Sequence, residues 1–241
     1  MFEASSTLLS LADGLAARAP LEPADRSAIL GLPHSLKAIG AGGHILREGD
    51  RPTRCRVLLQ GFACRHKIVA GGARQIVAIY VPGDLIDLQN LFVAYADDNV
   101  QTLTPVTVAA IPIEAIEQLV ERRPAIARAV MAAALAEAAI FREWLANIGR
   151  RDARGRLAHL LCEMAIRQSG ATPGPARRYE LPMTQEQLAD VLGLTPVHVN
   201  RTFRALEAEG LIERYKRSIT IPDWNALASS GDFKPDYLHV G

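Results

Sequence analysis

The sequence predicts an α+β protein with an N-terminal jelly roll, a long central helix and a C-terminal winged helix-turn-helix. Three observations support this fold class. Between Gly31 and Ile111, short runs of Val, Ile and Leu alternate with turn residues, which is typical of antiparallel sandwiches and jelly rolls. The segment Pro112–Ile148 has helical spacing of apolar residues. Further along, two short helical segments flank Gly193, as in a helix-turn-helix.

Composition limits the classes of protein that this chain represents. Its 241 residues are 49% hydrophobic and carry a formal net charge of +1. The apolar fraction supports a sizeable core, and the near-neutral charge excludes a histone-like or ribosomal-type basic protein. Cys55, Cys64 and Cys162 form neither a disulfide framework nor a CxxC zinc motif. With no signal-peptide pattern at the start, we expect a reduced, cytoplasmic protein.

The first predicted domain, residues 1–112, is the jelly roll with a preceding helix. That helix is expected at Pro23–Leu30. Pro23 is tolerated in a first turn, and the charge of Asp25 favours the positive end of a helix. The expected strands are Leu36–Ile39, His44–Arg47, Arg56–Gln60, Phe62–Val69, Arg74–Tyr80, Leu85–Ile86 and Val106–Ile111.

The second predicted unit, residues 113–148, is a dimerisation helix. Pro124 breaks or restarts it, because proline lacks an N–H donor. Beyond this proline, seven residues at three- and four-residue spacing form one stripe. The stripe could pack on the chain's own sheet, but we favour pairing with a second copy of the chain. The predicted dimer residues are Ile126, Val130, Ala133, Glu137, Phe141, Trp144 and Ile148.

The same helix contains the most membrane-like stretch of the chain, Ala125–Phe141. Arg128 and Glu137 interrupt this stretch. It is also shorter than the roughly 20 apolar residues that a membrane span needs. We therefore expect a packed helix of a soluble protein and no membrane partner.

The third predicted unit, residues 149–241, contains the helix-turn-helix. Thr184 is a good N-cap, with a glutamine three residues later that completes a capping box. Gly193 permits the left-handed conformation of a tight turn. Thr195 caps the next helix, and Pro196 occupies its first position. These signals together predict two helices joined by a short turn.

In such a motif the second helix enters the major groove of DNA. Arginine pairs with guanine, asparagine with adenine, and apolar side chains contact the thymine methyl group. A hairpin at Glu213–Ile221 supplies a wing for phosphate contacts. Any one of these charges alone is explained by a solvated surface, but their combination favours DNA binding. The predicted DNA-binding residues are Thr184, Gln185, Thr195, Pro196, Val197, His198, Asn200, Arg201, Arg204, Arg214, Lys216 and Arg217.

Three features together carry a resemblance to a known family. They are the run VPGDLI at residues 81–86, the long helix, and the motif LADVLGLT at 188–195 followed by VNR at 199–201. Over residues 21–228 the chain resembles the Crp/Fnr family of bacterial transcription regulators. The resemblance implies a double-stranded β-helix sensor domain of the cyclic-nucleotide-binding type and dimerisation through the long helix. It also implies a C-terminal winged helix, twofold-related DNA half-sites and contact with RNA polymerase.

The chain departs from the relatives that bind cyclic AMP. These carry Gly-Glu-Leu after the Pro-Gly-Asp turn, and then an Arg-Ser pair for the phosphate. This chain has Asp87-Leu88-Gln89 at the first place and Ala96-Asp97-Asp98 near the second. Because two carboxylates repel a phosphate, we expect no cyclic AMP. The candidate pocket for an unknown small-molecule effector is formed by Cys64, Arg65, Leu85, Asp87 and Gln89.

Two other family cofactors are also not expected. Oxygen-sensing relatives hold an iron–sulfur cluster with N-terminal cysteines, but no cysteine precedes Cys55 here, and three cysteines do not supply a Cys₄ site. The spacing of Cys64 and His66 is similar to that of haem-binding relatives, but the pair lies on an earlier strand. A buried strand face explains both residues better than haem.

The resemblance also bears on base recognition. Relatives usually carry a glutamate three residues before the position of Asn200, where it reads cytosine. Val197 stands there in this chain. Arg201 matches the family arginine that meets guanine. The resemblance therefore implies the guanine contact but not the usual half-site sequence.

Two alternatives belong to other functional classes. Metal-dependent cupin enzymes share the jelly roll but need two closely spaced histidines and a glutamate on adjacent strands. His34, His44 and His66 do not supply such a pair, so we expect neither an enzyme nor a metal site. A ligand-binding module with a degenerate helix-turn-helix is disfavoured by the intact caps and by the turn glycine.

Overall fold

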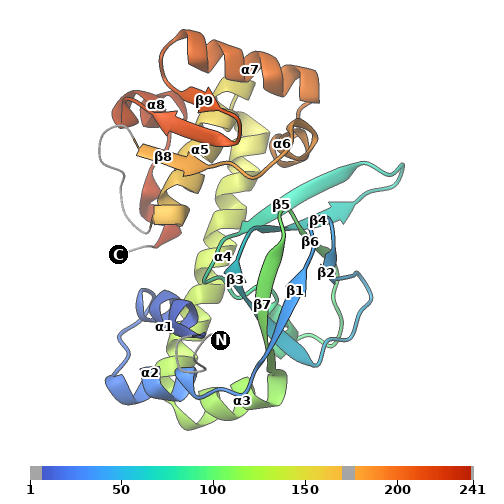
Figure 1. Ribbon diagram of the computed structural model, residues 1–241, viewed down its shortest axis with the longest axis vertical. Helices are drawn as coiled ribbons and strands as arrows, with labels where there is room; N and C mark the ends of the chain where they lie inside the picture. Colours follow the sequence, from blue (N-terminus) through green and yellow to red (C-terminus); the bar gives the residue numbers. More distant parts are fainter. Residues whose placement is uncertain (1–6, 170–176, 240–241) are drawn as a thin grey trace. The chain divides into compact units, whose positions relative to one another are not determined.

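The computed structural model describes residues 7–169 and 177–239 (Figure 1). The chain divides into two compact units. The first contains the residues before 68 together with 78–138, and the second contains 68–77 and 139–240. The boundary therefore falls inside the long helix rather than at one of its ends.

Two sheets form the predicted jelly roll. Their strand orders are β1-β7-β3 and β2-β6-β4-β5. The pairs of β7 with β1 and β3, and of β6 with β2 and β4, are antiparallel. The fold class is therefore confirmed. The strands are β1 (Ser35–Ile39), β2 (His44–Leu46), β3 (Arg54–Gln60), β4 (Ala63–Ile68), β5 (Arg74–Tyr80), β6 (Asn99–Thr102) and β7 (Val106–Pro112).

Two features of this domain differ from the sequence prediction. β6, which lies between β2 and β4, is absent from the strands predicted from the sequence. The predicted strand Leu85–Ile86 is only a single bridge between Leu85 and Val57. Both segments are too short for side-chain alternation to define them, so their strand character depends on pairing with distant strands.

Helices close the core of the first unit. Ile29 from α2, Val57 from β3 and Ile126 from α4 are buried in one apolar cluster. α2 begins at the predicted residue, where Asp25 completes a capping box with Glu22. The helices and 3₁₀ turn are α1 (Leu9–Ala16), α2 (Pro23–Leu30), η1 (Leu88–Leu91), α3 (Ile113–Arg122) and α4 (Pro124–Arg150).

α4 requires a correction to the predicted dimer residues. Ile126 and Val130 belong to the apolar cluster of their own unit. Trp144 is 6% exposed, and its indole N–H donates a hydrogen bond to Glu163. These three side chains face their own protomer and are not available to a second one. Ala133, Glu137, Phe141 and Ile148 are only half-buried. The prediction is therefore corrected at these three buried residues, and it stays a prediction at the four half-buried ones.

A second apolar stripe lies on the exposed side of α4. Met131, Leu135 and Leu145 are 56%, 61% and 75% exposed, and the half-buried Ala138 lies between them at matching spacing. The steps of four, three and seven residues follow a heptad pattern. By length and composition α4 could also span a membrane. Two of its residues, Ile126 and Val130, nevertheless pack into the apolar core of the first unit.

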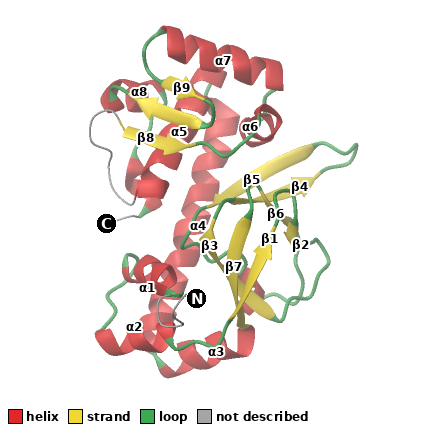
Figure 2. Cartoon of the chain, in the orientation of Figure 1, coloured by secondary structure: helices red, strands yellow, loops and turns green. Residues whose placement is uncertain are grey.

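The second unit contains the helix-turn-helix and a three-stranded sheet of order β8-β10-β9 (Figure 2). Arg74, from the segment 68–77, is ion-paired with Asp190 of α6 at 2.7 Å within this unit. The elements are α5 (Ala153–Ser169), β8 (Arg177–Glu180), α6 (Gln185–Leu192), α7 (Pro196–Ala208), β9 (Glu213–Tyr215), β10 (Ser218–Ile221), α8 (Trp224–Ser230) and η2 (Pro235–Leu238).

Candidate nucleic-acid interface

The helix-turn-helix has the caps that its sequence predicts. Thr184 Oγ1 accepts a hydrogen bond from Gln187 N at 3.2 Å, and Gln187 Oε1 accepts one from Thr184 N at 2.8 Å. Gly193 ends α6 with φ of 62°, a left-handed conformation that costs glycine little. Thr195 Oγ1 then accepts from His198 N at 3.3 Å. These bonds satisfy donors that the helix starts would otherwise leave unpaired.

The two sides of α7 differ in exposure. Val199 and Phe203 are fully buried, on the side where α7 contacts α5 and α6. Arg201 and Arg204 are exposed, and Val197 is 80% exposed. An apolar side chain left this open is suited to contact with a thymine methyl group. Of the other predicted residues in this motif, Thr184, Thr195 and Pro196 are exposed, and Gln185, His198 and Asn200 are half-buried.

The hairpin of β9 and β10 forms the predicted wing, and its three basic residues differ in their contacts. Lys216 and Arg217 are exposed at its turn, as phosphate contacts require. Arg214 instead donates from Nε to Glu207 Oε1 at 3.1 Å, and its guanidinium carbon lies 4.6 Å from the centroid of the Phe203 ring. The ion pair with Glu207 attaches the wing to α7, and the phosphate contact of Arg214 stays a prediction.

Two residues that the sequence analysis missed lie beside the wing turn. Tyr215 is 64% exposed. Arg178 Cζ lies 5.9 Å and Lys216 Nζ 5.4 Å from its ring centroid, within the range of cation–π attraction. Arg178 comes next to the wing because β8 pairs with β10, opposite Thr220. Only that long-range pairing identifies it, and no local motif does.

Arg65, one of the candidate effector residues, is the centre of a buried polar network in the jelly roll. Its Nη1 lies 2.8 and 2.7 Å from the two carboxylate oxygens of Asp98. Nε donates to the Tyr80 hydroxyl at 2.7 Å, and Nη2 donates to the Ile86 carbonyl at 2.6 Å. Tyr80 donates to Glu137 of α4 at 3.0 Å. Burial disfavours the charged guanidinium, but Tyr80 and Asp98 outweigh it and raise the pKa of Arg65.

Asp87 forms a separate cluster. It is fully buried, with Oδ1 accepting from Arg56 N at 2.6 Å and Oδ2 paired with the Arg56 guanidinium. Burial raises the pKa of Asp87, although Arg56 acts in the opposite direction. Cys64 is buried, and Leu85 and Gln89 are half-buried. The two charged members of the candidate effector pocket therefore have different protein partners.

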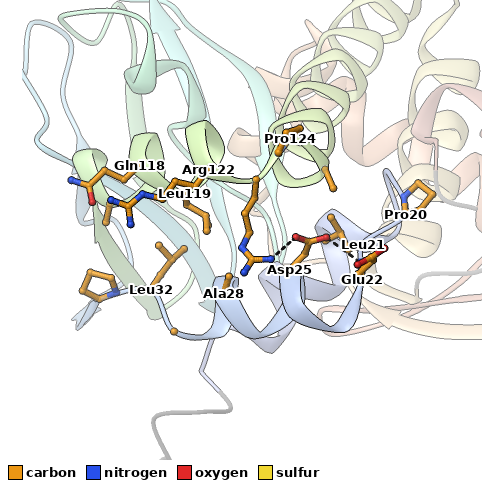
Figure 3. Close-up of a pocket in the computed structure, with 15 residues that line it drawn as sticks. Pro20, Leu21, Glu22, Asp25, Ala28, Leu32, Gln118, Leu119, Arg122 and Pro124 are labelled. Atoms are coloured by element: carbon orange, nitrogen blue, oxygen red, sulfur yellow. Dashed lines mark hydrogen bonds and ion pairs between the residues drawn. The ribbon is translucent and has the colours of Figure 1, made fainter.

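A groove of about 930 Å³ lies beside α2 and α3 (Figure 3). Its charged side chains include Asp25 and Arg123, which form an ion pair at 3.0 Å. Asp25 also accepts a hydrogen bond from Glu22 N at 3.2 Å. These groups stabilise the start of α2. The groove is lined by none of the five candidate effector residues.

Two protein-family models match the chain. A Crp-like helix-turn-helix domain matches residues 155–230, and a cyclic nucleotide-binding domain matches residues 36–123. The first match covers α5, the helix-turn-helix and the wing. The second covers the strands of the jelly roll together with α3.

Curated relatives extend the similarity over most of the chain. The transcriptional activator protein FnrL of Cereibacter sphaeroides is 29% identical over 199 residues, covering 80% of this chain and 79% of the relative. The nitrogen fixation regulation protein FixK of Bradyrhizobium diazoefficiens is 30% identical over 183 residues, 76% of each chain. The solved structure of FixK2 from Bradyrhizobium japonicum matches with a TM-score of 0.75 and 23% identity, covering 82% of this chain and 97% of the other. The structural match supports the fold.

Proposed function

The chain belongs to the Crp/Fnr family of transcription regulators, and on this basis we propose that it binds twofold-symmetric DNA sites as a homodimer. The main support is the capped helix-turn-helix, whose α7 exposes Val197 and Arg201 on the side away from the core. In this geometry the second helix enters the major groove. Arg201 contacts guanine, and Asn200 and Val197 contact neighbouring bases.

The dimer forms through the exposed stripe of α4. Met131, Leu135 and Leu145 give each protomer three large apolar side chains along one side of a helix, all more than half exposed. Two such helices bury these side chains against each other in a parallel pair. The twofold axis of this pair then matches the symmetry of the DNA half-sites.

The jelly roll works without cyclic AMP, an iron–sulfur cluster or haem. Asp98 neutralises Arg65, the buried cation of the domain, and thereby removes a partner for a phosphate. Cys55, Cys64 and Cys162 are all buried. Burial raises the pKa values of the Cys55 and Cys162 thiols, with a smaller contribution from Asp87 at Cys55. The Cys55 and Cys162 side chains are therefore structural thiols rather than reactive thiolates.

The remaining proposals follow from the family. Its regulators act in the cytoplasm and contact RNA polymerase once bound to DNA, and we extend both properties to this chain. Modulation of DNA binding through the N-terminal domain is also consistent with the family. We further propose that the protein is not an enzyme, because the relatives it matches are transcription regulators.

Selection of bound duplexes from a random DNA library at near-physiological salt tests this function. We expect the wild-type protein to enrich a twofold-symmetric site. Arg201→Ala is expected to lower the affinity for that site by about 1–3 kcal/mol and to relax the base preference at one position in each half-site. Equal, small losses on the selected site and on random DNA would contradict the role of Arg201.

Lys216→Ala provides the matched comparison, because Lys216 lies at the turn of the wing and is assigned to phosphate. We expect a similar loss of affinity on all sequences. The slope of log affinity against log salt should become shallower by about one for each protomer. Anisotropy titrations at several salt concentrations measure that slope. An unchanged slope would place Lys216 outside the interface.

A further inference from the structure

The last turns of α4 and the start of α5 are joined by only two residues, Arg151 and Asp152. So short a join keeps the ends of the two helices close together, and side-chain contacts cross between them. Two of these contacts are direct. Trp144 Nε1 donates to Glu163 Oε2 at 2.9 Å, and Asn147 Nδ2 donates to the Arg156 carbonyl at 3.3 Å. Both acceptors belong to α5.

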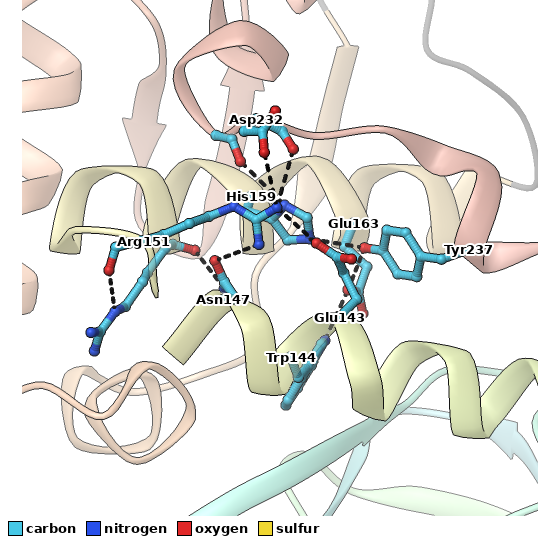
Figure 4. A network of polar contacts seen from close by, with 10 residues as sticks. Glu143, Trp144, Asn147, Arg151, His159, Glu163, Asp232 and Tyr237 are labelled. Atoms are coloured by element: carbon cyan, nitrogen blue, oxygen red, sulfur yellow. Dashed lines mark hydrogen bonds and ion pairs between the residues drawn. The ribbon is translucent and has the colours of Figure 1, made fainter. Parts of the chain in front are cut away.

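The C-terminal segment 231–238 forms hydrogen bonds with α5 and with Arg151 at this join (Figure 4). The Tyr237 hydroxyl donates to Glu163 Oε2 at 2.7 Å, the same oxygen that accepts from Trp144. It also lies 3.1 Å from Nε2 of His159. Arg151, between the helices, pairs with Glu143 of α4 at 2.7 Å and donates to the Asp232 carbonyl at 3.2 Å.

The polar groups of this network are buried, so water does not replace a hydrogen bond that is lost there. Glu163 is fully buried and His159 is 1% exposed. Burial, followed by the charge of Glu163, raises the pKa of Tyr237, so its hydroxyl keeps the proton that it donates. Burial also lowers the pKa of His159, against the opposing charge of Glu163. A buried carboxylate that loses a donor pays a large desolvation penalty.

Aromatic packing holds the segment against α5. The Phe233 ring meets His159 edge-on at 5.1 Å, and the Tyr237 ring stacks on His159 at 5.8 Å between centroids. Gly231 fits where a side chain would not, because a Cβ there would lie 2.6 Å from His159 N. The close approach of the backbone brings the Gly231 carbonyl to 3.3 Å from His159 Nδ1.

A further hydrogen bond connects the join to the helix-turn-helix. Arg156, whose carbonyl accepts from Asn147, donates from Nη1 to the Leu192 carbonyl at 3.0 Å. Leu192 is the last residue of α6. Hydrogen bonds through Arg156 therefore connect the end of α4 with the first helix of the helix-turn-helix.

We propose that the segment 231–238 fixes the angle between α4 and the DNA-binding helices, with Tyr237 as its positioning residue. The inference rests on the proposed function, because the angle matters only for a dimer that reads two half-sites. A fixed angle sets the distance between the two recognition helices. It therefore makes the protein selective for one spacing of the half-sites.

Tyr237→Phe tests this, because it removes one hydroxyl and keeps the ring. The probes are the duplex selected by the wild-type protein and two versions with one base pair inserted or deleted at its centre. The readout is the ratio of affinities for correct and altered spacing. We expect Tyr237→Phe to lower this ratio about five- to tenfold. A merely destabilised fold lowers binding to all three duplexes equally and leaves the ratio unchanged.

Tyr95→Phe is the matched control, since Tyr95 is 59% exposed and lies in the first unit. It should leave the ratio at the wild-type value. Gly231→Ala should lower the ratio in the same direction as Tyr237→Phe, through the clash with His159. Wild-type ratios in both Tyr237→Phe and Gly231→Ala would overturn the inference. Failure of the wild-type protein to select any site would instead overturn the proposed function, and the inference with it.

Discussion

Replacing Asp98 by alanine is expected to lower the free energy of unfolding by about 3–5 kcal/mol. Asp98 is the counter-ion of Arg65, and both residues are nearly excluded from solvent, at 6% and 2% exposure. Without Asp98 the guanidinium remains buried, with the neutral oxygens of Tyr80 and Ile86 as its hydrogen-bond partners. The charge of Glu137 also acts on Arg65, but this carboxylate accepts the hydrogen bond of Tyr80. An uncompensated charge in this environment is costly because water does not reach it. Urea unfolding followed by circular dichroism measures the loss.

The neighbouring aspartate supplies a matched control. Asp97 is paired with Lys67 at 3.8 Å, but its side chain is 67% exposed. Because exposed pairs contribute about 0–1 kcal/mol, Asp97→Ala should change the stability little. The double variant Arg65→Met, Asp98→Leu removes both charges together and should recover most of the stability lost in Asp98→Ala. Equal effects of the two single alanine variants would show that the buried pair carries no special weight.

The network around Arg65 also shows what a sequence pattern does not predict. Alternation along β4 places Cys64 and Arg65 on opposite faces of the strand. In the structure both are buried. The position of Arg65 is explained only by Asp98, which lies 33 residues further along the chain. Local periodicity carries no information about a partner at that distance.

The helix-turn-helix is predicted well because its signals are local. The hydroxyl of Thr184 and the amide of Gln187 meet within a single turn, and Gly193 adopts the backbone conformation that its lack of a Cβ permits. The wing is only partly predicted. The partner of Arg214, Glu207, lies on the preceding helix. This ion pair therefore depends on how the hairpin folds back against α7.

The long helix shows a different difficulty. Alanine-rich helices carry apolar residues on more than one side, and spacing alone does not say which side faces the core. The stripe that begins at Ile126 is the more regular of the two, and its first residues, Ile126 and Val130, pack in the core of their own protomer. The stripe of Met131, Leu135 and Leu145 is shorter but exposed. Only the positions of β3, β7 and α2 around the helix distinguish these two sides.

Leu135→Glu is therefore expected to convert the dimer to monomers. Leu135 is 61% exposed and lies near the middle of the exposed stripe, where a pair of helices would place two glutamates close together. Both the loss of apolar burial and the repulsion between like charges oppose association. Because linked binding of two half-sites multiplies affinity, loss of the dimer should weaken binding to the symmetric site by on the order of 10²–10⁴-fold. Sedimentation velocity and anisotropy titrations measure the two effects.

Three comparisons make this test specific to the exposed stripe. Leu145→Glu, ten residues further along the same side, should give the same monomer and the same loss of affinity. Leu135→Met keeps an apolar side chain of similar volume and should remain a dimer. An unchanged far-ultraviolet spectrum would show that α4 is intact in each variant.

A dimeric Leu135→Glu protein that binds the symmetric site normally would place the interface elsewhere. Because α7 is untouched, the monomer should still bind a single half-site weakly, which separates loss of pairing from loss of DNA recognition.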